Sequence, residues 1–116
     1  MARARIPDDT GIAAVRVFPG DRENAATAVR YLLQILAEQA EGNTVEVRVP
    51  PYGAVQAIEG PRHTRGTPPN VIETDPVTWV ALATGALAWA DGLAGGKVHA
   101  SGSRADLSQH LPLLRE

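Results

Sequence analysis

Polar side chains that could do chemistry gather in the segment from Glu59 to Asn70, which reads EGPRHTRGTPPN. Arg62, His63 and Arg65 stand on a backbone stiffened by three prolines. Their donors could therefore meet a carboxylate or a phosphate with little ordering entropy left to lose. In the alternative interpretation, the arginines pair with Glu59 or Glu73 and lock the loop over a sheet. These residues, Arg62, His63, Arg65 and Glu73, form the predicted polar site.

Other candidates for catalysis or metal binding are isolated in the sequence. The glycines of the same loop do not match a phosphate-binding loop, because threonine follows the second one where that motif needs lysine. The three histidines form no i, i+4 pair and cysteine is absent, which argues against zinc. His99 and Ser101 have no acid nearby in sequence and no G-x-S-x-G elbow. Glu73 and Asp75 could share a proton, but Asp75 is better explained as a helix cap. We therefore predict no catalytic residue, no metal, no cofactor and no enzymatic activity.

Size and charge limit the classes of protein that this chain can be. Its 116 residues suit one folded domain, and its net charge of −2 provides no broad cationic surface for nucleic acid. The start, MARARIPDDTG, becomes polar where a secretory signal needs an apolar run. No stretch approaches the roughly 20 apolar residues that cross a bilayer. We expect a cytoplasmic protein without a transmembrane segment.

The first part of the chain predicts one long helix followed by strands. Apolar residues recur at three- and four-residue steps between Asp21 and Glu41, as on one face of a helix. Val45, Val47 and Val49 alternate with polar residues, which is the period of a strand. The residues 52–58 and 71–74 predict two further strands, with hairpin connections. The run from Ile12 to Phe18 is assigned to an edge strand or an arm.

The second part predicts two short helices, a strand and a terminal helix. Asp75 followed by Pro76 is a helix start, because the aspartate can cap and proline suits the first turn. The residues 87–93 predict a second helix, 97–101 a last strand, and Leu107 to Leu114 a terminal helical turn or two. Grouped strands and grouped helices indicate an α+β fold, with an antiparallel or mixed sheet covered on one face. We divide the chain into an N-terminal arm, 1–20, and a single domain, 21–116.

Two runs of residues resemble the sterol carrier proteins. One is DPVTWVALATGALAWADGLAGGKVHASGSRADLSQHLPLL, and RVPPYGAVQAIEGPRHTRGTPPNVIETDP makes the likeness closer to the family's short bacterial orthologues. The resemblance covers about residues 25–114. It implies a five-stranded sheet with helices packed on one face. In the lipid-transferring members it also implies a tunnel for fatty-acyl or sterol ligands between helices and sheet, and it supplies no catalytic residue.

The composition bears on whether such a tunnel exists here. Only 4% of the residues are aromatic and alanine fills the predicted helices, so the helices could lie close to the sheet. An empty space of about 300 Å³ would cost roughly 7 kcal/mol, which favours close packing or an apolar filling. We predict a shallow groove near the two tryptophans and the last leucines, although the rings could simply fill the core. The predicted apolar site comprises Trp79, Leu82, Ala83, Trp89, Leu93, Leu111 and Leu114.

Two hypotheses for function follow from these features. The first is a non-enzymatic, sterol-carrier-like module that binds an apolar or lipidic small molecule between helices and sheet. The alternative is an interaction or regulatory module without a lipid tunnel. It would use the Glu59–Asn70 loop to dock an anionic ligand or a protein partner. A homodimer is left open by the sequence, and nucleic acid is not an expected partner.

Overall fold

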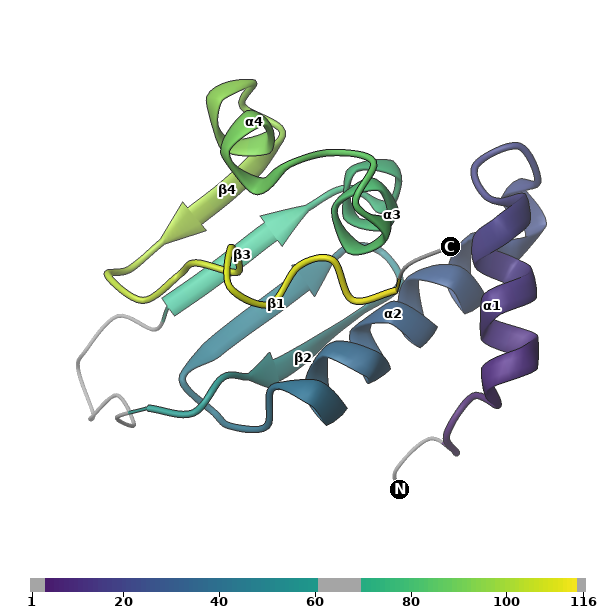
Figure 1. Cartoon of the computed structure of the whole chain (residues 1–116), viewed down its shortest axis with the longest axis horizontal. Coiled ribbons are helices and arrows are strands. Elements are labelled where there is room, and N and C mark those ends of the chain that lie inside the picture. Colours follow the sequence, from purple (N-terminus) through teal and green to yellow (C-terminus); the bar gives the residue numbers. More distant parts are fainter. Residues whose placement is uncertain (1–3, 61–69, 115–116) are drawn as a thin grey trace.

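The computed structural model describes residues 4–60 and 70–114 and has an α+β architecture (Figure 1). Two helices are followed by three strands, two further helices and a last strand. In chain order the elements are α1 (Asp8–Val17), the 3₁₀ turn η1 (Arg22–Asn24), α2 (Ala25–Gln39), β1 (Val45–Val49), β2 (Gly53–Ala57), β3 (Asn70–Thr74), α3 (Pro76–Thr84), α4 (Trp89–Ala94) and β4 (Val98–Ser101).

The strands form one mixed sheet in the order β2-β1-β3-β4. β1 pairs with β2 antiparallel and with β3 parallel, and β3 pairs with β4 antiparallel. The described residues thus form a four-stranded sheet, and the expectation of five strands is wrong for them. The hairpin between β1 and β2 is confirmed. A hairpin between β2 and β3 is wrong, because β1 lies between these two strands.

The alternating strand residues separate a covered face from an open face. The side chains of Val45, Val47 and Val49 are fully buried, which confirms the predicted strand period. The register places Arg48 beside Ala54 on one side and Glu73 on the other, and Glu73 beside His99. These residues lie on the open face, which is polar.

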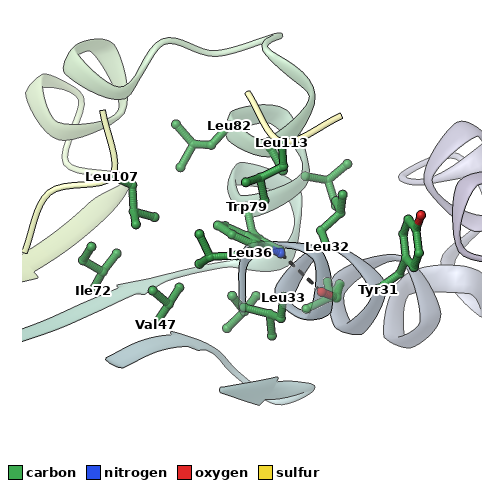
Figure 2. Packing of buried hydrophobic residues seen from close by; sticks show 14 of the residues in the cluster. Tyr31, Leu32, Leu33, Leu36, Val47, Ile72, Trp79, Leu82, Leu107 and Leu113 are labelled. Carbon is green, nitrogen blue, oxygen red and sulfur yellow. Dashed lines mark hydrogen bonds between the residues drawn. The ribbon is translucent and has the colours of Figure 1, made fainter. Parts of the chain in front are cut away.

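Helices α2 and α3 and the C-terminal segment, residues 102–114, cover the other face of the sheet (Figure 1). Leu107 from this segment is fully buried and lies over Ile72 of β3 (Figure 2). The predicted terminal helical turns are wrong, since residues 105–114 contain turns and extended chain but no helix. The amides of Leu113 and Leu114 instead donate to the carbonyl of Ala83, at 2.8 and 3.1 Å. Tertiary contacts with α3 thus replace the hydrogen bonds of a local helix.

The N-terminal residues form helix α1, so the expected edge strand between Ile12 and Phe18 is wrong. Asp8 and Asp9 lie in the first turn, where carboxylates favour a helix. Gly11 lies against the ring of Tyr31, and any side chain at this position would overlap that ring. The apolar pattern of residues 12–18 is too short to indicate helix or strand by itself. Close packing of α1 on α2 therefore fixes the helical conformation of these residues.

A polar network holds α1 and the residues before it on α2. The Arg5 guanidinium donates to both carboxylate oxygens of Glu38, at 2.6 and 2.9 Å, and to Asp8 at 3.1 Å. The buried Tyr31 hydroxyl donates to the same Asp8 carboxylate at 2.8 Å. Gln34 exchanges two hydrogen bonds with the backbone of Ile6, at 2.8 and 2.9 Å. The segment is therefore docked by specific contacts as well as by apolar packing.

Candidate ligand-binding site

Helix α3 is the element around which the candidate site is built. Asp75 caps its start, with one carboxylate oxygen accepting from the Thr78 amide and the other from the Thr78 hydroxyl, both at 2.8 Å. Gly85 ends the helix at φ 86°, in the left-handed region that favours glycine. The predicted Asp75–Pro76 start is therefore confirmed.

The cap also sets the charge state of Asp75. Its partial burial acts to raise the pKa, but the hydrogen bonds from Thr78 and the nearby Lys97 ammonium outweigh this effect. The pKa of Asp75 is consequently below its usual value. The carboxylate is thus held ionised for capping, which leaves little reason for it to share a proton with Glu73.

The layer between the helices and the sheet is filled by side chains. Trp79, Leu36 and Val47 are 0% exposed, and Ile72 is 1% exposed. Figure 2 shows Trp79 and Leu36 facing these strand residues, with Leu107 above Ile72. The Trp79 indole also donates to the Val29 carbonyl of α2 at 3.3 Å. An apolar ligand cannot enter this part of the layer without displacing side chains.

An apolar hollow of about 370 Å³ lies at the rim of this layer. It is formed where the end of α3, the start of α4 and the C-terminal segment meet. The Leu87 amide donates to the Ala81 carbonyl at 3.1 Å, which folds the α3–α4 connection back onto α3. The apolar side chains that line it are Leu82, Leu87, Ala88, Trp89, Ala90, Leu111 and Pro112. Its volume lies within the range of small-molecule pockets.

The structure brings together only part of the predicted apolar set. Leu82, Trp89 and Leu111 line the hollow. Trp79 and Ala83 lie in the core at 0% exposure. Leu93 is 41% exposed on the outside of α4, and Leu114 packs against the core, half-buried.

The sequence analysis missed several residues that line the hollow, namely Gly85, Leu87, Ala88, Ala90, Ser108 and Pro112. Leu87 was assigned to the predicted helix 87–93, whereas α4 begins at Trp89. Leu87 therefore lies in the connection, where it can reach the C-terminal segment. Proline next to Leu111 was a signal against the predicted terminal helix, because proline has no amide to donate.

The predicted polar site is only partly within the described residues. Arg62, His63 and Arg65 lie outside them. Glu73 is on the open face, where it lines a polar hollow of about 400 Å³ with Asp75, Lys97 and His99 among others. Residues 4–60 and 70–114 contain no group of three acidic or histidine side chains arranged to hold a metal ion.

The residues on either side of the loop are fixed by hydrogen bonds. The Ile58 amide donates to the Ala40 carbonyl at 2.7 Å, and the Ile58 carbonyl accepts from the Thr44 amide at 3.2 Å. The Asn70 side chain donates to the Thr44 carbonyl and accepts from the Arg104 amide, both at 3.0 Å. The two attachment points of the loop are therefore held at the same end of the sheet, at the start of β1.

The fold and the rim hollow define a small α+β module that covers one sheet face with helices and an extended C-terminal segment. The family model for bacterial orthologues of sterol carrier proteins matches residues 21–113. The chain therefore belongs to this family. A comparison with curated proteins found no match. None of the helices in the described part of the chain is long and apolar enough to cross a membrane.

Proposed function

We propose that this chain is a non-enzymatic carrier module whose ligand is an apolar or lipidic small molecule. The ligand's apolar part binds in the hollow between α3, α4 and the C-terminal segment. The observation that carries the proposal is this hollow of about 370 Å³ in a chain of the bacterial sterol carrier family. Its walls are mostly leucine, tryptophan, alanine and proline, with Gly85 and one polar side chain, Ser108, so they offer mainly apolar contact.

The geometry favours the rim over a tunnel between the helices and the sheet. The central layer is occupied by side chains such as Trp79 and Ile72, at 0% and 1% exposure. At the rim, by contrast, Leu87 and Leu111 are only half-buried. Covering them with a ligand would remove apolar surface from water at about 25 cal/mol per Å². A bound chain therefore gains most at the rim, without displacing the core.

A titration with a long-chain fluorescent fatty acid tests this proposal. Leu111→Glu and Leu87→Glu each place a carboxylate in the wall, and each should weaken binding by roughly tenfold or more, because the bound chain would desolvate that charge. Leu93→Asp changes a leucine that lies outside the hollow and should leave binding unchanged. Circular dichroism of each variant establishes that it is folded.

Tryptophan fluorescence gives an independent reading of the same site. The chain has two tryptophans, so Trp79→Phe leaves Trp89 as the only one. Because Trp89 lines the hollow, ligand binding should shift the emission of this variant. A folded protein that binds no fatty-acyl probe, or that binds it equally well with Leu111→Glu, would show the proposal to be wrong.

A further inference from the structure

The rim hollow changes from apolar to polar between its floor and its edge. Leu82 and Trp89, which are 1% and 9% exposed, form part of the floor. Ser108 stands at the exposed edge and contributes the one hydroxyl of the described lining. That lining includes no charged side chain. A ligand in the hollow would therefore lie with its apolar part over the floor and its head group beside Ser108.

The Trp89 indole supplies a second hydrogen-bonding group to the lining. Its N–H donates to no group among residues 4–60 and 70–114. In the same residues, every fully buried side-chain nitrogen or oxygen of the buried and half-buried residues has a hydrogen-bond partner. The Trp89 N–H is consequently at the exposed edge of the ring, where a bound molecule can accept from it. Trp79 differs, because its indole donates to the Val29 carbonyl.

The charge next to this edge is negative. The Asp106 carboxylate accepts from the Ser108 amide at 2.8 Å, and no residue in the range 76–90 carries a charge. Hydrogen bonds from Ser108, with a contribution from nearby His110, hold the pKa of Asp106 below its usual value. His110 is the one residue in the range 105–114 that can carry a positive charge, and Asp106 offsets that charge. An anionic head group beside Ser108 would thus meet a carboxylate and no lysine or arginine of the described lining.

Hydrogen-bond donors without a cation favour a neutral acceptor. A fatty-acid anion that loses water on entering the hollow would find no positive partner to compensate for that loss. An alcohol or ester oxygen can accept from the Trp89 N–H at a much smaller cost, and an alcohol can also exchange hydrogen bonds with the Ser108 hydroxyl. We propose that the rim hollow takes lipids with an uncharged oxygen head group, an alcohol or an ester, in preference to fatty-acid anions. This inference rests on the carrier function proposed above and names the class of its ligand.

Competition among ligands with one chain length and different head groups tests this inference. The probes are dodecanol, methyl dodecanoate, dodecanoate and dodecylamine, each used to displace the fluorescent fatty acid from the folded chain at neutral pH. Dodecanol and methyl dodecanoate should bind at least roughly tenfold more tightly than dodecanoate. Tighter binding of dodecanoate or of dodecylamine than of dodecanol would overturn the inference, because the preferred head group would then be charged.

Charge variants of the C-terminal segment separate recognition by the protein from the lower solubility of the alcohol. Ser108→Lys places a cation at the edge of the hollow and should lower the ratio of dodecanol to dodecanoate affinity by roughly tenfold or more. Gln109→Lys adds the same charge at a neighbouring residue outside the lining and should leave this ratio unchanged. Asp106→Asn removes the negative charge, keeps an acceptor for the Ser108 amide and should lower the ratio by roughly threefold. Equal ratios in the two lysine variants would overturn the inference.

The indole N–H signals in NMR spectra locate the head group independently of affinity. The Trp89 signal should move downfield when dodecanol binds, whereas the signal of Trp79, which already donates to the Val29 carbonyl, should stay in place. A Trp89 signal that does not move at saturating dodecanol would overturn the inference. If all four probes bind equally well, the head-group inference fails and the carrier function stands. If neither they nor the fluorescent fatty acid bind to the folded chain, the carrier function fails and the inference fails with it.

Discussion

Trp79→Ala tests whether the layer between helices and sheet is closed. Trp79 is 0% exposed and packs with side chains of both layers, and its indole donates to the Val29 carbonyl at 3.3 Å. Removing a fully buried tryptophan ring costs about 3–5 kcal/mol when the surroundings cannot collapse into the space. At roughly 4 °C per kcal/mol for a domain of this size, Tm should fall by on the order of 15 °C.

Urea unfolding monitored by circular dichroism measures this loss of stability. Trp89→Ala is the matched control and should cost less, since one side of the Trp89 ring already faces the rim hollow. Indole should bind the cavity left by Trp79→Ala and restore about 2.7 kcal/mol when present at 100 times its Kd. A loss below about 1 kcal/mol for Trp79→Ala would refute the reasoning, because a sealed tryptophan cannot be removed so cheaply.

Three further predictions concern a helix cap, a pH dependence and the polar loop. Asp75→Ala should lower the free energy of unfolding by about 1 kcal/mol in urea titrations, while Asp75→Asn, which keeps a capping oxygen, should lose less. Hydrogen bonds from Tyr31 and from the neighbouring guanidinium hold the pKa of Asp8 below its usual value. The ionised Asp8 carboxylate therefore stabilises the folded state fully above its unfolded pKa of about 3.9. This contribution is lost as the pH falls through the lower pKa that Asp8 has in the folded state. Asp8→Asn should remove this acid-dependent loss in unfolding measured between about pH 2 and pH 7, and an unchanged profile would contradict it. Arg62→Glu with Arg65→Glu should leave fatty-acyl binding unchanged, because the described lining of the hollow comes from residues 82–90 and 108–112, and reduced binding in the same titration would implicate the loop.

Local signals in the sequence were sufficient for the elements whose patterns are regular. The alternation of Val45, Val47 and Val49 predicted β1, and Asp75 with Pro76 predicted the start of α3 at the observed residue. The helix expected between Asp21 and Glu41 appears as α2, with η1 before it. In each case, residues close in sequence determine the structure through capping or periodicity, so that no knowledge of distant contacts is required.

Elements that depend on distant contacts could not be predicted in the same way. Ile12 to Phe18 is too short and too uniformly apolar to indicate helix or strand, and packing of Gly11 on Tyr31 decides for a helix. In the C-terminal segment, the amides of Leu113 and Leu114 donate to the Ala83 carbonyl instead of forming the hydrogen bonds of a local helix. The parallel pairing of β1 with β3 likewise depends on where the chain after β2 returns, which no local signal specifies.

The same distinction applies to the candidate site. Composition predicted a shallow apolar groove near the tryptophans, and Leu82, Trp89 and Leu111 do line one hollow. The sequence could not separate these residues from Trp79 and Ala83, because all are apolar and lie on neighbouring turns or segments. Only the packing of α3 against both α2 and the C-terminal segment determines which side chains face the core.

Chemical-shift mapping with a bound fatty acid is the most direct test of the central claim, that the layer is closed and ligands bind at its rim. Methyl and amide signals should be recorded with and without the ligand. Shifts and contacts to the ligand should be confined to Leu87, Trp89, Leu111 and their neighbours. Contacts between the acyl chain and the methyl groups of Val47 or Ile72 would contradict the account, because they would place the ligand inside the layer.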